Sequence, residues 1–280
     1  MRSKAATERM QSAVSYAILL TFLLFVIFPF YWMTVTSFKN EEQMRSLISM
    51  FWPRPLVGEN YAQLLAKTDF LKWYANSATV AISSTLLATA VGTIGAYALA
   101  RLRFLGRGFM ASATLITYLV PPSILFIPLY AQMRSLGLAN SLGGLIAAYP
   151  SFTVPFVTWL LMGYFESIPE ELEEAAMIDG ATRFGAFYRV VLPLSAPGVL
   201  AAGLYAFTQA WNEFLYALVF ITDGKLRTLP VGLASFITGD VYGWGYLMAG
   251  AVLTTLPVIA AYIYLQKYMV DGLTAGSVKG

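Results

Sequence analysis

The chain lacks both cysteine and histidine among its 280 residues, and charged side chains make up only 12% of it. The first two absences exclude disulfides, thiol chemistry, most zinc sites and acid–base catalysis by histidine. Soluble domains carry about 25% charged residues, so this chain has roughly half the usual complement. The net charge is only +3 and the basic residues are scattered, which argues against a nucleic-acid partner.

Apolar side chains are abundant instead: 58% of the residues are hydrophobic and the mean hydropathy is +0.64. This composition predicts an all-α integral membrane protein. A helix needs about 20 apolar residues to cross a bilayer. The first apolar run is too long for a cleavable signal peptide and has no small-residue cleavage site, so we expect it to be retained. The six predicted transmembrane helices are residues 13–37, 77–100, 109–132, 141–164, 196–220 and 244–267.

Arginines in the short connections predict the orientation. Arg101, Arg103 and Arg107 crowd the connection between the second and third spans, with no acidic residue among them. Because short basic loops stay in the cytoplasm, we expect both termini to be cytoplasmic. The predicted organisation is a cytoplasmic tail 1–12, a transmembrane domain 13–268 that includes a cytoplasmic loop 165–195, and a cytoplasmic tail 269–280.

Two patterns within the spans bear on helix packing. Small residues recur every four positions in the second span, which predicts a groove for a neighbouring helix; they are Ser84, Ala88, Gly92 and Ala96. Prolines interrupt other spans and free backbone carbonyls, so they mark either simple kinks or broken helices that line a transport pathway. These are Pro29, Pro121, Pro122, Pro128, Pro150 and Pro155.

The densest acidic cluster lies in the 165–195 loop, in the stretch EELEEAAMIDGATRFGAFYRVVLP that begins at residue 170. Ser167 and Glu170 have the spacing of a capping box, which predicts a short helix over about 168–179. Gly180 is expected to end this helix. Its first turn holds four carboxylates close to the positive end of the helix dipole, namely Glu170, Glu171, Glu173 and Glu174.

Small residues follow these carboxylates and would let a partner approach the backbone closely. They are Ala175, Ala176 and Gly180. A second amphipathic turn is expected to place four apolar residues on one face and to end at Pro193; the four are Phe184, Phe187, Tyr188 and Val191. A helix pair lying on the bilayer is the alternative, but helices on membrane surfaces favour Lys and Arg. The acidic helix therefore predicts docking to a cytoplasmic protein.

The same stretch resembles the EAA signature of bacterial ABC-importer permeases. Glu174-Ala175-Ala176 is followed after three residues by Gly180, and after nine more by VVLP at 190–193, with valine at 190 where isoleucine is commoner. The similarity covers nearly the whole chain, through AYALARLRFLGR at 96–107, IPLY at 127–130, LGL at 136–138 and TLPVGL at 228–233. WNEF at 211–214 and GLTAGSVKG at 272–280 are similar to maltose-type carbohydrate permeases.

The resemblance implies that the acidic helix, between spans four and five, is a coupling helix seated in a dimeric cytoplasmic ATPase subunit. ATP and Mg would bind that partner, because this chain contains no G-x-x-x-x-G-K-[ST] phosphate loop and is expected to hold no cofactor. ATP-driven closure of the partner would move the permease between inward-facing and outward-facing states. The candidate coupling residues are Glu170, Glu171, Glu173, Glu174, Ala175, Ala176, Asp179, Gly180 and Pro193.

Further partners follow from the same resemblance. The first is a homologous permease subunit, which would form a heterodimer with this chain. The second is an extracytoplasmic solute-binding protein, which would touch loop 222–243. The third is a carbohydrate, expected to be a di- or oligosaccharide. The location implied is the inner membrane of a bacterial or archaeal cell. The C-terminal tail would reach the ATPase interface, unless it is a frayed terminus; its candidate residues are Gly272, Thr274, Gly276 and Lys279.

Glu213 is the only acidic residue within the predicted spans. A carboxylate at that depth is costly and usually faces a cavity or a partner. Together with Gln209 and Asn212 it could line a polar sugar pathway, or it could make a hydrogen bond that only packs two helices together. Aromatic rings that could bind sugar lie nearby, and these are Tyr118, Trp159, Tyr205, Trp211 and Tyr216.

Two other classes of function remain open from the residues alone. An ion-coupled secondary transporter or channel would use Glu213, but it would be expected to have paired charges within the membrane. An integral membrane enzyme would need a catalytic or metal-ligating set, and the sequence offers none. Candidate substrate-pathway residues are therefore Tyr118, Gln209, Trp211, Asn212 and Glu213.

Overall fold

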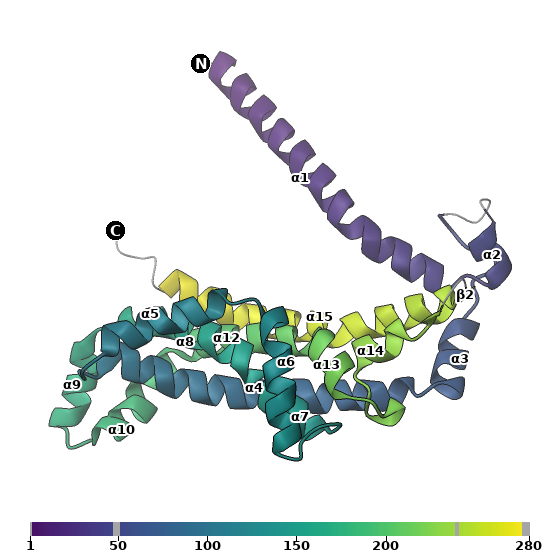
Figure 1. Ribbon diagram of the computed structural model, residues 1–280. Helices are drawn as coiled ribbons and strands as arrows, with labels where there is room; N and C mark the ends of the chain where they lie inside the picture. Colours follow the sequence, from purple (N-terminus) through teal and green to yellow (C-terminus); the bar gives the residue numbers. More distant parts are fainter. Residues whose placement is uncertain (1, 47–50, 239–240, 276–280) are drawn as a thin grey trace. The chain divides into compact units, whose positions relative to one another are not determined.

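A computed structural model describes residues 2–46, 51–238 and 241–275. Regular structure in these residues is helical except for two short antiparallel strands, β1 (Ile237–Thr238) and β2 (Val241–Tyr242). The predicted all-α class is therefore confirmed (Figure 1). The chain divides into two compact units, one comprising Met1–Phe70 with Leu233–Thr255 and the other Leu71–Gly232 with Leu256–Gly280.

The first unit contains the longest apolar helix, whose Met10–Ser37 segment is long and apolar enough to cross a membrane. None of the residues in its most apolar 18-residue stretch is buried. Such a helix is expected where lipid or another chain covers its surface. A capping box begins the next helix, because Asn40 accepts a hydrogen bond from the Gln43 N–H at 2.7 Å while the Gln43 side chain accepts from the Asn40 N–H at 3.0 Å. The helices here are α1 (Arg2–Ser37), α2 (Glu41–Arg45), α3 (Glu59–Lys67) and the beginning of α15 (Trp244–Ala275).

The second unit is built from α4 and the helices that follow it, together with the rest of α15. It includes one π-helical segment, η1, and one 3-10 turn, η2. The elements are α4 (Phe70–Arg101), α5 (Arg107–Leu119), α6 (Pro122–Ser135), α7 (Leu142–Ala148), α8 (Pro150–Glu166), α9 (Glu170–Ile178), α10 (Arg183–Ala186), η1 (Phe187–Val191), α11 (Leu192–Leu194), α12 (Ala196–Trp211), α13 (Leu215–Phe220), η2 (Gly224–Leu226) and α14 (Leu229–Ala234).

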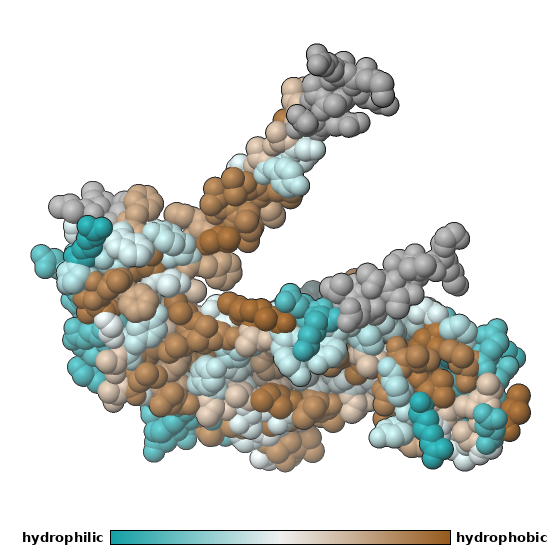
Figure 2. Space-filling model, turned by 180° about the vertical axis from the view of Figure 1, so that it is seen from behind, coloured by the Kyte–Doolittle hydropathy of each residue, from teal (hydrophilic) through white to brown (hydrophobic). Residues whose placement is uncertain are grey.

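Four helical segments of the described residues are long and apolar enough to span a membrane, and two bent helix pairs bring the number to six if each counts as one span. Apolar side chains cover much of the face seen in Figure 2, as expected of surfaces that contact lipid. The four straight segments are Met10–Ser37, Phe70–Arg101, Leu142–Glu166 and Trp244–Tyr268, and the bent pairs are Arg107–Leu119 with Pro122–Ser135 and Arg183–Leu194 with Ala196–Trp211.

Two predicted spans are not continuous helices. The predicted span 109–132 bends by 99° between α5 and α6, where Val120 and Pro121 are extended. Proline lacks an N–H and disfavours the helical conformation of the residue before it, so the consecutive prolines at 121 and 122 account for this break. The predicted span 196–220 is helical only to Trp211 and resumes at Leu215 in α13.

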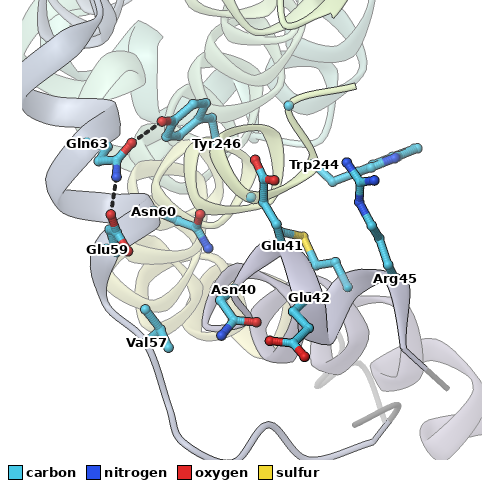
Figure 3. A pocket seen from close by; sticks show the side chains of 13 residues that line it. Asn40, Glu41, Glu42, Arg45, Val57, Glu59, Asn60, Gln63, Trp244 and Tyr246 are labelled. Atoms are coloured by element: carbon cyan, nitrogen blue, oxygen red, sulfur yellow. Dashed lines mark hydrogen bonds between the residues drawn. The ribbon is translucent and has the colours of Figure 1, made fainter. Parts of the chain in front are cut away.

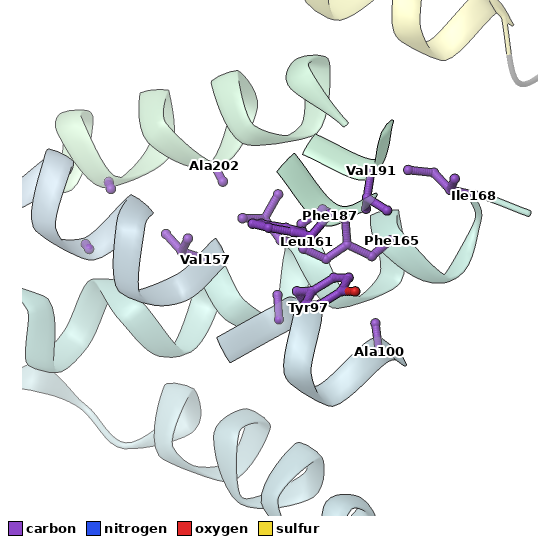
Figure 4. Packing of buried hydrophobic residues seen from close by; sticks show 12 residues of the cluster. Tyr97, Ala100, Val157, Leu161, Phe165, Ile168, Phe187, Val191 and Ala202 are labelled. Atoms are coloured by element: carbon purple, nitrogen blue, oxygen red, sulfur yellow. The ribbon is translucent and has the colours of Figure 1, made fainter. Parts of the chain in front are cut away.

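The small-residue groove of α4 receives α8, as predicted. Ala88 and Ala96 are fully buried, and a Cβ added at Gly92 would lie 2.5 Å from Cγ1 of Val157. Val157 and Leu161 of α8 belong to the same buried cluster, which continues through Tyr97, Phe165, Phe187 and Val191 (Figure 4). This core joins α4, α8 and α12 to the segment that follows α9, so the acidic loop rests on packed helices.

Candidate functional site

The acidic helix α9 begins at Glu170 and is preceded by Pro169, which makes no side-chain cap. The predicted capping box at Ser167 and Glu170 is therefore wrong. Ser167 lies directly after the last residue of α8, and its hydroxyl donates to the Tyr164 carbonyl at 2.7 Å. The serine thus satisfies the C-terminus of one helix and is not available to begin the next.

The C-terminus of α9 is a Schellman motif. Gly180 N–H donates to the Met177 carbonyl at 3.1 Å, and Ala181 N–H donates to the Ala176 carbonyl at 3.0 Å. This ending requires the left-handed conformation at Gly180, which has φ +90°. No neighbouring atom lies within 4 Å of the position that its Cβ would occupy. The predicted stop at Gly180 is confirmed, and the glycine leaves open surface next to the end of the helix.

The inner side of α9 is tied to the end of α4. Glu173 is buried, and its carboxylate lies 3.4 Å from Nε of Arg101 and accepts a hydrogen bond from the Tyr97 hydroxyl. Arg101 also donates to the Ile168 carbonyl at 2.5 Å and pairs with Glu170 at 3.5 Å. Burying two charges is favourable only when each is paired and hydrogen-bonded. Both side chains are paired and each makes a hydrogen bond, although Nε of Arg101 itself has no hydrogen-bond partner among the described residues. Glu173 is therefore a buried contact within the chain, whereas Glu170 pairs with the same arginine from an exposed position.

The outer side of α9 is open. The described residues Glu170, Glu171, Glu174, Ala175, Asp179 and Gly180 are all exposed, Ala176 is half-buried, and Pro193 is exposed in α11. A cavity of about 460 Å³ beside α9 is lined by three glutamates, Met177 and three arginines. Of these arginines, Arg103 and Arg183 form no ion pair with a carboxylate in the described part of the chain. This surface offers charges of both signs to a partner.

The segment after α9 differs from the expected amphipathic turn. Phe187 and Val191 are buried, but Phe184 and Tyr188 are 74% and 63% exposed, so the four residues do not share one face. The π-helical segment η1 has more residues per turn than an α-helix, which rotates the later side chains away from the α-helical positions. Pro193 does not end the segment either, because the helical conformation continues through α11 to Leu194.

Three of the candidate pathway residues are engaged in local packing. Glu213 accepts hydrogen bonds from the N–H groups of Tyr216 at 2.7 Å and Ala217 at 3.1 Å, so it caps α13. The Tyr149 hydroxyl also donates to Glu213, at 2.8 Å. Trp211 is only 2% exposed, and the Asn212 side chain donates to the Thr208 carbonyl at 2.9 Å. These contacts match the packing alternative for Glu213.

The other two candidates lie together. Tyr118 of α5 and Gln209 of α12 line a cavity of about 220 Å³ at the bend between α5 and α6. Ser151 and Phe152 of α8 and Tyr205 of α12 line the same cavity. Sequence reasoning included Tyr205 among the candidate aromatic residues but missed Ser151 and Phe152. In the sequence, only the prolines at 121 and 122 indicated that the helix is interrupted at this point.

Comparison with protein families identifies the chain. Residues 88–274 match the family described as "Binding-protein-dependent transport system inner membrane component". The chain belongs to this family. The predicted family resemblance is confirmed, and the chain is a non-catalytic, multi-pass permease component of an ABC transporter of the inner membrane. The alternatives of an ion-coupled transporter and a membrane enzyme are thereby set aside.

Individual relatives agree with this membership over nearly their whole length. The sulfoquinovosyl glycerol transport system permease protein SmoH of Agrobacterium fabrum is 40% identical over 91% of this chain and 89% of its own. The trehalose/maltose transport system permease protein MalG of Thermococcus litoralis is 37% identical, with 91% and 92% coverage. A crystal structure of a bacterial ABC transporter for the acidic polysaccharide alginate has a chain that matches at a TM-score of 0.81 and 25% identity, over 94% of this chain and 97% of that one.

The first unit of this permease contains a further cavity, of about 800 Å³, between α2, α3 and the start of α15 (Figure 3). Its lining includes Glu41, Glu42 and Arg45 of α2, together with Trp244. A hydrogen-bond chain lies on one wall, in which the Tyr246 hydroxyl donates to the Gln63 side chain and that amide donates to Glu59. Sequence reasoning did not anticipate this cavity, because its walls come from segments far apart in the chain.

The candidate residues of the C-terminal tail are only partly described. The backbone at Gly272 and Thr274 is helical, because α15 continues to Ala275, beyond the predicted end of the last span at 267. Gly276 and Lys279 lie outside the described residues.

Proposed function

We propose that this permease moves a carbohydrate, a di- or oligosaccharide, into the cytoplasm by alternating access driven by a separate ATPase subunit. The proposal draws its substrate class from relatives that are named for trehalose/maltose and sulfoquinovosyl glycerol, and from the alginate importer. The single observation that supports the coupling mechanism is α9, a helix with an exposed acidic outer side and an inner side bonded to α4.

The ATPase docks on the outer side of α9. Its exposed carboxylates and small residues provide a surface that a protein cleft can surround closely, and the open space at Gly180 lets backbone approach backbone. Glu173 contacts Arg101 and Tyr97 of α4, so it links α9 to the membrane helix and does not contact the ATPase. We assign ATPase contact to Glu170, Glu171, Glu174, Ala175, Ala176, Asp179 and Gly180, with Pro193 holding the following segment.

Movement of α9 reaches the membrane through the contact of Glu173 with Arg101 and Tyr97. Arg101 is the last residue of α4, a helix that runs without interruption from Phe70. A pull on α9 therefore acts directly on a long membrane-spanning helix. Because packed helices shift as rigid bodies, this route converts closure of the ATPase into a change in the permease.

The rest of the proposed assembly is the one that the family resemblance implies. ATP and Mg bind the dimeric ATPase, a homologous permease completes the pathway as a heterodimer, and both termini lie in the cytoplasm. A solute-binding protein docks on the opposite side, against the 222–243 connection. The C-terminal residues Gly272, Thr274, Gly276 and Lys279 contact the ATPase.

Uptake into proteoliposomes tests the transport proposal. The permease is copurified with its partners, reconstituted, and supplied with the binding protein and a panel of radiolabelled neutral and acidic oligosaccharides. We expect uptake to require ATP on the side of the membrane where the ATPase lies. We also expect the uptake rate to saturate as the concentration of one sugar of the panel is raised. ATP-independent uptake driven by an ion gradient would contradict the proposal.

The docking surface is tested by crosslinking. Because the chain contains no cysteine, an introduced cysteine is its only thiol. Ala175→Cys on α9 should crosslink to the ATPase and resist an impermeant thiol reagent added outside cells. Ala62→Cys on α3, also exposed, is the matched control. It should not crosslink to the ATPase and should react with the impermeant reagent. An Ala175→Cys variant that never captures the ATPase in an active complex would overturn the docking assignment.

A further inference from the structure

The cavity at the bend between α5 and α6 opens where backbone leaves the helical conformation within a predicted span. Val120 and Pro121 are extended there, and Pro122 begins α6. Irregular backbone within a bilayer is tolerated only where protein buries it or where it lines a cavity. In this chain a cavity of about 220 Å³ lies against Val120 and Pro122. Broken helices with this arrangement build the substrate sites of many transporters.

The cavity lies about halfway along three of the predicted spans, 109–132, 141–164 and 196–220. Helices rise 1.5 Å per residue, so Tyr118 lies about 17 Å from the first residue of α5. By the same rise, Gln209 lies about 20 Å from the start of α12, and Phe152 lies about 21 Å from the end of α8. These three helix ends belong to the same side of the membrane, and the hydrocarbon core is about 30 Å thick. The lining is therefore too deep for an interfacial aromatic belt.

The lining combines aromatic rings with hydrogen-bonding groups. Tyr118, Phe152 and Tyr205 contribute rings, and Ser151 and Gln209 contribute a hydroxyl and an amide. Phe156 packs against two of the rings, with its centroid 5.1 Å from that of Tyr118 and 3.9 Å from that of Tyr205. The Tyr205 side chain lines the cavity together with those of Tyr118 and Gln209. The lining thus offers both aromatic rings and hydrogen-bonding groups, as a saccharide ring requires.

The residues that line this cavity carry no charge. Acidic sugars are bound through arginine or lysine, whose charge and hydrogen bonds match a carboxylate or sulfonate. An uncharged cavity at this depth would not repay the cost of removing an anion from water. The volume is also small for a ligand site, so it suits one ring rather than a whole oligosaccharide.

We propose that this cavity is a subsite for one uncharged saccharide ring, contributed by this permease to the translocation pathway. The inference rests on the proposed carbohydrate function and goes beyond it in two respects. It assigns sugar contact to this subunit, through Tyr118, Phe152, Tyr205 and Gln209, and it selects neutral over acidic sugars.

Substitutions in the reconstituted complex test the subsite. Tyr205→Phe and Gln209→Ala each remove a hydrogen-bonding group, so we expect each to raise the KM for uptake of the neutral sugar by about 3- to 10-fold. Tyr188→Phe and Gln132→Ala are matched controls at exposed positions outside the cavity, and their uptake kinetics should equal those of the unsubstituted protein.

The outcomes separate the two proposals. If the unsubstituted complex takes up no saccharide of the panel, the carbohydrate function fails. If it takes up a neutral saccharide and all four variants behave alike, the subsite alone is overturned. A preference of the unsubstituted complex for acidic over neutral sugars would also overturn the subsite. A change in maximal rate without a change in KM would show that the tyrosine and glutamine only support packing, and would likewise count against it.

Discussion

Arg101 at the end of α4 and Glu173 on α9 form an ion pair with 3.4 Å between Nε and Oε2, and both side chains are almost fully buried. The second oxygen of Glu173 accepts a hydrogen bond from Tyr97, one turn earlier on α4. Together with the contacts of Arg101 to Glu170 and to the Ile168 carbonyl, this pair fixes the position of α9 along α4. It also explains why one glutamate of the cluster is turned away from solvent.

Removal of the arginine should release α9. Arg101→Ala leaves the Glu173 carboxylate buried without its counter-charge, which costs about 3–5 kcal/mol for a pair of this kind. Because the apolar spans are unchanged, we expect normal membrane insertion, faster hydrogen exchange across residues 165–195 and loss of ATP-driven uptake. Hydrogen exchange followed by mass spectrometry measures the first effect directly.

Arg103→Ala is the control for this prediction, since Arg103 is exposed and makes no ion pair with a carboxylate in the described residues. Surface substitutions of this kind usually change stability by no more than about 0.5 kcal/mol. Equal exchange rates in the two variants would show that the buried pair does not hold α9 in place.

Gly180 is predicted to act through its lack of a side chain as well as through its backbone. Gly180→Val should abolish ATP-driven uptake, because a β-branched residue resists the left-handed conformation by roughly 1–2 kcal/mol. Gly180→Asn relieves most of that strain, since asparagine tolerates positive φ. We expect the asparagine variant to insert and fold normally but to transport poorly, because its side chain fills the open surface beside α9. Full transport by Gly180→Asn would limit the role of this glycine to the Schellman turn.

The contact between α4 and α8 should show strong coupling between Gly92 and Val157. The Cβ of Gly92→Ala would meet Val157 at 2.5 Å, and overpacking of this kind costs about 1–3 kcal/mol. We expect a lower melting temperature of the purified complex, and a smaller decrease when the same change is made together with Val157→Ala. Gly163→Ala on α8 is the control, because its added Cβ meets nothing within 4 Å. Strict additivity of the two changes would contradict the close packing.

Local signals in the sequence predicted much of this architecture. Apolar length indicated the spans, the spacing of small residues indicated the groove of α4, and Gly180 indicated the end of α9, because each depends on residues close together in the chain. Prolines at 121 and 122 indicated an interruption, but not its 99° bend. That angle depends on how α5 and α6 pack against the other helices.

Features that depend on distant residues could not be predicted. Glu173 belongs to a run of similar glutamates, and its buried contacts with Arg101 and with Tyr97, 76 positions earlier, separate it from the others. Ser167 has the spacing of a cap, but the end of α8 uses its hydroxyl first. Tyr118, Ser151 and Gln209 come from three helices, so nothing in the spacing of these residues indicates a shared cavity.

Glu213 provides the last prediction, because its two proposed roles have different consequences. As the cap of α13 it accepts two backbone N–H groups and the Tyr149 hydroxyl. In Glu213→Gln a single amide oxygen can accept only some of the hydrogen bonds that the two carboxylate oxygens accept. We therefore expect a loss of about 1 kcal/mol in the free energy of unfolding, typical of a lost helix cap. Transport should remain ATP-driven and should keep its dependence on pH, because no proton moves through the carboxylate.

Tyr149→Phe is the companion variant for Glu213→Gln, since it removes one donor and leaves the carboxylate in place. Both variants should lower the melting temperature of the complex while retaining most of the uptake rate. An ion-coupled mechanism would give a different pattern, in which Glu213→Gln abolishes uptake at unchanged stability and Tyr149→Phe shifts its pH profile. Melting curves and uptake rates measured across a range of pH distinguish the two patterns, because a helix cap affects mainly stability and a proton carrier affects mainly transport.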